Sequence, residues 1–80
     1  MDLVIPEKLS DKRQRIEKQY EADEIFKDIY DDYLTYHKAL KLWEQSNTDD
    51  APARRREYAE LVGDLEDELL QYLIEKERDS

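Results

Sequence analysis

The stretch FKDIYDDYLTYHKALKLW, residues 26–43, decides the fold. Its apolar residues recur at alternating intervals of three and four, which places them on one stripe of an α-helix. The members of the stripe are Phe26, Ile29, Tyr33, Tyr36, Leu40 and Trp43. They extend over about five turns, which is about 25 Å of helix. Because this is coiled-coil spacing, we expect the stripe to be buried against another helix.

A second stripe follows the polar residues 46–51. Its members are Tyr58, Val62, Leu65, Leu69 and Tyr72, which are separated by four, three, four and three residues. Leu61 and Leu73 lie beside them and widen the stripe. Two matched stripes joined by a short loop predict an antiparallel hairpin with Trp43 near Tyr58 and Phe26 near Tyr72. The expected fold class is therefore all-α: a helical hairpin with an additional N-terminal helical segment, completed as a bundle by dimerisation.

We expect one helical domain over residues 1–80, because a chain this short forms at most one. Asp49 or Asp50 is expected to cap the last helix, whose first turn tolerates Pro52. Asp23 is a candidate N-cap further upstream, so residues 10–45 form either two helices or one long helix. The predicted segments are an arm over 1–9, a helical segment over 10–21, hairpin helices over 23–45 and 52–77, and a loop over 46–51.

Some apolar residues have no place in a simple hairpin. One group is N-terminal, and the second hairpin helix, expected to end near Lys76, should not reach it. Another group lies off the two seams, around Gly63. Together they predict a third packing layer, formed either by the N-terminal helix or by a dimer mate. The candidate interface residues are Leu9, Ile16, Tyr20, Tyr30, Leu34, Gly63, Leu70 and Ile74.

Gly63 costs about 1 kcal/mol against alanine inside a helix. Either it permits close approach of a backbone, or it is a tolerated neutral residue. The first alternative predicts that Gly63→Leu weakens assembly, and the second that Gly63→Ala stabilises the protein.

The net charge of −9 argues against binding to nucleic acid or to an anionic membrane surface and would suit a basic protein partner. Residues 57–75 contain seven acidic side chains and no lysine, arginine or histidine. We expect the basic residues Lys12, Arg13 and Arg15 of the same chain, or of a second subunit, to offset them. The arginines at positions 54–56 are expected to pair with Glu57, Glu60 and the loop aspartates.

Candidate chemistry is sparse. The chain has no cysteine, one glycine and a single histidine, His37, which lacks a glutamate at the spacing of di-metal bundle sites. Carboxylates also recur about one helical turn apart, at Asp28 and Asp32 and at Glu60, Asp64, Asp67 and Glu68, but they lie beside or opposite the apolar stripes, where water is expected. We therefore expect no enzyme activity, no cofactor and no metal. The longest apolar run is residues 3–5, so we expect no membrane span, no signal peptide and a cytoplasmic protein.

Residues 23–73 resemble the YdcH-like small proteins in layout. Those proteins begin their first helix with a motif like Asp-Pro-x-Phe. The corresponding residues here are Asp23-Glu24-Ile25-Phe26, so Glu24 stands where the family has a proline. Their closing turn is matched by Leu65-Glu66-Asp67-Glu68-Leu69. The basic second helix of that family is missing here. The resemblance implies a hairpin and no particular activity.

The function that these features favour is a protein–protein interaction or structural module. We expect it to self-associate as a homodimer and to present acidic faces to a protein partner. The alternative is an acidic antagonist that mimics nucleic acid and occupies the basic groove of a DNA- or RNA-binding protein.

Overall fold

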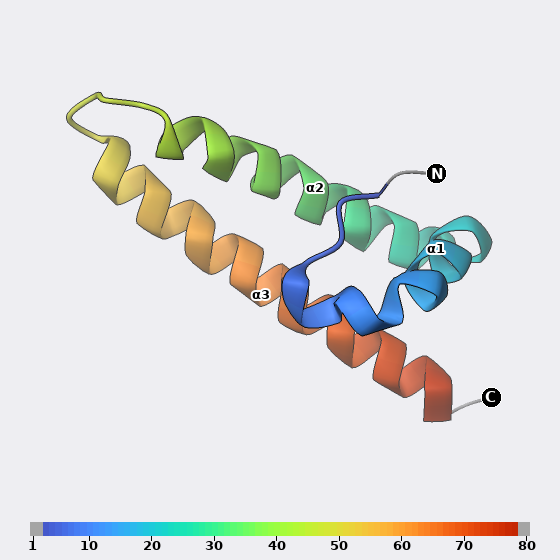
Figure 1. The fold of residues 1–80 in the computed structure, drawn as a ribbon. Coiled ribbons are helices and arrows are strands. Elements are labelled where there is room, and N and C mark those ends of the chain that lie inside the picture. The colour runs from blue at the N-terminus through green and yellow to red at the C-terminus, as the bar shows by residue number, and fades with distance from the viewer. Residues whose placement is uncertain (1–2, 79–80) are drawn as a thin grey trace.

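The computed structural model describes residues 3–78, which form three α-helices packed against one another after a short 3₁₀ helix (Figure 1). The prediction of an all-helical fold is confirmed. The elements are η1 (Glu7–Lys12), α1 (Arg13–Ala22), α2 (Glu24–Glu44) and α3 (Ala51–Arg78). The molecule is elongated, 49 × 23 × 22 Å, because α2 and α3 lie side by side along its long axis.

Ring contacts give the register of α2 and α3. Phe26, in the first turn of α2, lies 5.6 Å from Tyr72 near the end of α3. Tyr36 lies 6.0 Å from Tyr58, which is early in α3. The two helices therefore run in opposite directions, joined by the loop at one end of the molecule (Figure 1). We call residues 35–61 the loop half, and residues 3–34 with 62–78 the open half.

Asp23 separates α1 from α2. Its backbone is extended, with φ −133° and ψ 109°, and its side chain accepts hydrogen bonds from the N–H groups of Ile25 and Phe26 at 3.0 and 3.2 Å. These are two of the donors that a helix start leaves unpaired. The chain therefore forms two helices here, and not one long helix over residues 10–45.

The N-terminal segment folds back over the open half as a third layer. Leu9 and Ile16 have no exposed surface, and the ring of Tyr20 meets that of Tyr30 edge to face at 6.0 Å. Before η1, the chain crosses α2, where the Tyr30 hydroxyl donates to the Val4 carbonyl (Figure 1). We call residues 3–22 the N-terminal layer.

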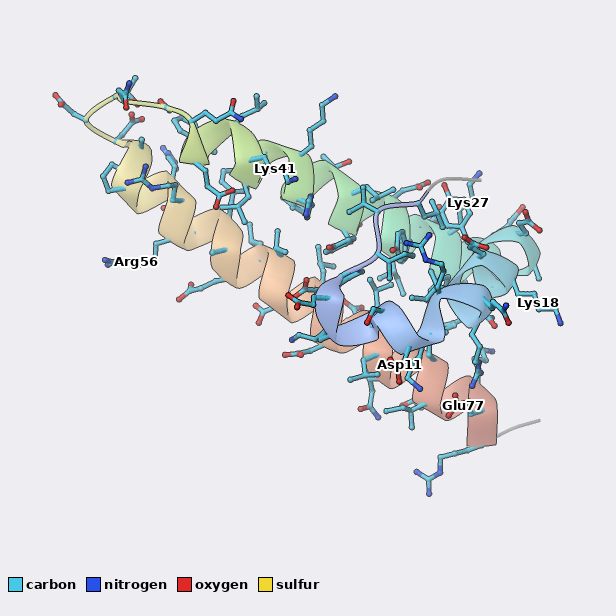
Figure 2. All side chains as sticks on the ribbon, viewed as in Figure 1. Asp11, Lys18, Lys27, Lys41, Arg56 and Glu77 are labelled. Carbon is cyan, nitrogen blue, oxygen red and sulfur yellow. The ribbon has the colours of Figure 1, made fainter. Side chains whose placement is uncertain are left out.

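Ion pairs attach this layer to α3. Lys8 Nζ lies 3.1 Å from Asp67 and 3.8 Å from Glu66. Lys12 lies 3.6 Å from Glu77, near the C-terminal end of α3 (Figure 2), and Arg15 also pairs with Glu77. The expectation that the last helix cannot reach the N-terminal segment is therefore wrong, because the chain reverses at Asp23 and returns to α3.

The segment boundaries differ from the predicted ones by a few residues. The arm ends at Pro6, not at residue 9, because the Pro6 carbonyl accepts from the Leu9 N–H at 2.9 Å and starts η1. At the loop, the Asp50 carbonyl accepts a hydrogen bond from the Arg54 N–H at 3.1 Å, and the Asp50 carboxylate accepts one from the Thr48 hydroxyl. Within residues 3–78, no helix is long and apolar enough to cross a membrane.

Candidate interaction surface

Burial is concentrated in the open half. Three α2 residues there, Phe26, Tyr30 and Tyr33, are at most 1% exposed. In the loop half, all of which the structure describes, Ala51 alone is buried. The α2–α3 seam therefore continues into the loop half without a third layer to cover it.

Apolar side chains in the loop half are correspondingly exposed. Leu42 is 64% exposed and Leu61 is 41% exposed. Tyr36, Leu40 and Trp43, which belong to the predicted first stripe, are only partly buried. A two-helix pair can cover one side of each seam residue, and the other side stays in contact with water.

A shallow hollow of about 290 Å³ lies on the loop half, lined by Ala39, Leu42, Trp43 and Ser46. Ala39 and Leu42 are three residues apart on α2 and so share one side of the helix, and Ser46 follows the end of α2. The residue that the sequence analysis missed is Leu42. Its signal was present: it is a leucine that lies off the stripe, directly before Trp43.

Charge is distributed as unevenly as burial. Residues 35–61 carry five basic and five acidic side chains, so the loop half is net neutral. The rest of the chain carries eight basic and 17 acidic side chains, which is the whole net charge of −9. The least buried part of the seam is therefore also the part with the least electrostatic repulsion toward another acidic molecule.

The arginine cluster belongs to this neutral half. Arg54 pairs with Glu57 at 2.9 Å, as expected. Arg55 and Arg56 have no carboxylate within 4.0 Å among residues 3–78, so the expected pairing of all three is wrong. Arg56 extends from the loop end of α3 away from α2 (Figure 2). The arginines need no partner within the chain because water solvates them at this exposed end.

Six of the eight predicted interface residues belong to the core of the open half or pack against it. Leu9, Ile16 and Tyr30 have no exposed surface. Tyr20, Leu34 and Leu70 are partly buried and pack against the core. Gly63 and Ile74 are partly exposed, and a Cβ at Gly63 would meet no atom within 4 Å. Within one chain, the third layer is therefore the N-terminal segment, and Gly63 serves no close approach.

Hydrogen bonds from tyrosine hydroxyls connect the helices in the open half. Tyr72 donates to the Asp23 carboxylate, and this bond raises the pKa of Tyr72 to about 12. The same bond is the main reason why the pKa of Asp23 is lowered, with help from its backbone and Gln19 donors. Tyr20 donates to Asp31 at 2.6 Å, which raises the pKa of Tyr20. These carboxylates act as structural acceptors.

No chemistry-bearing cluster is evident in the part of the chain that the structure describes. Residues 3–78 contain no group of three histidine, cysteine or carboxylate side chains placed to hold a metal ion. His37 packs against the ring of Tyr33 at 5.6 Å. Comparisons of the chain with family models, with curated proteins and with solved structures find no match. The resemblance to the YdcH-like proteins therefore stays a prediction.

Proposed function

We propose that this protein is a non-enzymatic protein–protein interaction module that self-associates through its loop half. The observation that carries the proposal is the coincidence of an uncovered apolar seam with local charge neutrality over residues 35–61. Elsewhere on the surface, two copies with a charge of −9 would repel each other.

A second copy fits this surface better than an unrelated chain. Two loop halves, each a pair of antiparallel helices, would pack as a four-helix bundle with coiled-coil-like seams. Leu42 and Trp43 of one chain would meet the corresponding hollow of the other, which is the self-complementary contact that a twofold dimer requires. The open halves, which carry the net negative charge, would point away from each other.

The proposal is tested by sedimentation over a range from micromolar to several hundred micromolar chain. We expect a concentration-dependent dimer that Leu42→Asp weakens by about tenfold or more, since fully burying a leucine contributes about 1.5–3 kcal/mol. Ile25→Asp is the matched control, because Ile25 is 65% exposed but lies in the open half. A compact monomer at the highest concentration, or equal weakening by both variants, would contradict the proposal.

A second candidate is the acidic antagonist that mimics nucleic acid. The observation that favours it is a row of exposed carboxylates along α3, at Glu57, Glu60, Asp64 and Glu68. The affinity of such a row of carboxylates for a basic groove should fall steeply between low and moderate salt concentration. Association through the apolar loop half should persist over the same range.

A further inference from the structure

The row of carboxylates on α3 borders an apolar residue. Glu57, Glu60, Leu61, Asp64 and Glu68 are separated by three, one, three and four residues, so they lie along one side of the helix. All five are exposed, and the first four line a shallow hollow of about 350 Å³. We call these five residues the acidic face.

Of the four carboxylates of the acidic face, Glu57 alone has a basic partner, Arg54, among residues 3–78. Among residues 3–78, Glu60, Asp64 and Glu68 have no basic group within 4.0 Å, whereas Glu66 and Asp67 pair with Lys8. Repulsion between such carboxylates one turn apart costs some tenths of a kcal/mol per pair. A cationic partner on this face would remove that cost.

The N-terminal layer shows what kind of segment α3 accepts. Leu9 and Ile16 enter the core, while Lys8, Lys12 and Arg15 border them and pair with α3 carboxylates. The layer is therefore an apolar strip edged with basic side chains. Leu61 and Glu66 lie about 140° apart around α3, so the N-terminal layer leaves the acidic face uncovered.

We infer that the acidic face binds an amphipathic helix with lysine and arginine beside its apolar strip, supplied by a partner protein. Leu61 contacts the apolar strip and the alkyl parts of the basic side chains, and Glu60, Asp64 and Glu68 pair with their charged ends. A second copy does not fit here, because its own basic helix is already used in its N-terminal layer. The inference goes beyond self-association. Glu60 and Leu61 also belong to the loop half, but the contact proposed for the second copy is the separate hollow of Leu42 and Trp43 on α2, so either proposal can fail without the other.

The test uses the full chain and a fluorescent amphipathic helical peptide of leucine and lysine, followed by anisotropy. We expect binding that is about tenfold weaker for a scrambled peptide of the same composition, which has no apolar face. Leu61→Ser and the double variant Glu60→Gln/Asp64→Asn should each weaken binding about fivefold or more, with unchanged helicity by circular dichroism. Sedimentation of Leu61→Ser should match that of the unchanged chain.

The matched control is Asp11→Asn/Glu21→Gln, which removes the same charge from exposed carboxylates of the N-terminal layer. It should leave peptide affinity within about twofold. Equal weakening by the two double variants would overturn the proposal, because binding would then follow net charge alone. Equal binding of the scrambled peptide would overturn it as well, in favour of a purely electrostatic acidic surface. Absence of binding by the amphipathic peptide would also overturn it.

Discussion

In the open half of the molecule, Tyr30 and Leu69 have no exposed surface, whereas Leu40 and Trp43 in the loop half are only partly buried. All four lie on or beside stripes with the same helical spacing. The difference is the N-terminal layer, which covers the seam at one end only. A matched apolar pattern thus determines which helices meet, and a third element determines where a core closes.

The two halves also differ in how their polar groups are used. In the open half, Asp23, Asp31 and Glu77 each hold another element through a hydrogen bond or ion pair. In the loop half, Arg54 and Glu57 pair one turn apart on the same helix, which adds little to tertiary structure. Under the proposed function, stability and self-association depend on opposite ends of the α2–α3 pair.

The largest expected effect is on the core of the open half. Leu69→Ala should lower the free energy of unfolding by about 2–5 kcal/mol, because Leu69 is fully buried and a cavity would remain. Leu40→Ala, on the partly exposed seam, should cost about 1 kcal/mol or less in dilute solution. Urea unfolding followed by circular dichroism measures both. Equal losses would mean that the core extends into the loop half.

A smaller effect is expected at Asp23, whose hydrogen bond with Tyr72 connects α2 and α3 in the open half. The pKa of Asp23 is lowered in the folded chain, so its contribution is complete above its usual pKa and is lost as the pH falls through the lowered value. Asp23→Asn keeps a side chain that can cap the helix but cannot ionise. The free energy of unfolding of this variant should therefore fall less steeply toward low pH. Thermal unfolding between about pH 2 and pH 6 measures it. A loss of stability toward low pH that is as steep in Asp23→Asn as in the unchanged chain would contradict this prediction.

The smallest effect is expected at Gly63, just inside the open half. A Cβ there meets nothing within 4 Å, so Gly63→Ala should stabilise the chain by up to about 1 kcal/mol through helix propensity. Urea unfolding in dilute solution measures the change. Destabilisation, or weaker self-association of the variant, would show that another backbone approaches α3 at this point.

Much of this architecture is local and could be read from the sequence. The stripe over residues 26–43 and the capping role of Asp23 depend on neighbours in the chain, and both are present. The contact that closes the open end joins Asp23 to Tyr72, 49 residues apart, and no local pattern encodes it. For the same reason, the sequence showed an unpartnered face at Leu9 and Ile16 without deciding which chain covers it.

The candidate surface was harder to predict. Leu61 was assigned to the second seam, yet it is 41% exposed, because a residue at the edge of a stripe is buried only where a third element covers it. Leu42 was passed over because it lies off the first stripe. No third element covers either position, because the N-terminal layer contacts α3 at Glu66, Asp67 and Glu77, which lie nearer the C-terminal end of that helix.

Hydrogen exchange of backbone amides, measured at low and at high chain concentration, tests the central claim most directly. We predict slow exchange in the first half of α2 and in the second half of α3 at both concentrations, since these segments form the closed core. Amides of residues 36–44 and 54–60 should exchange fast in dilute solution and become protected when the chain is concentrated. Two results would contradict the account: equally slow exchange along the whole of α2 in dilute solution, or exchange in the loop half that is the same at low and at high chain concentration.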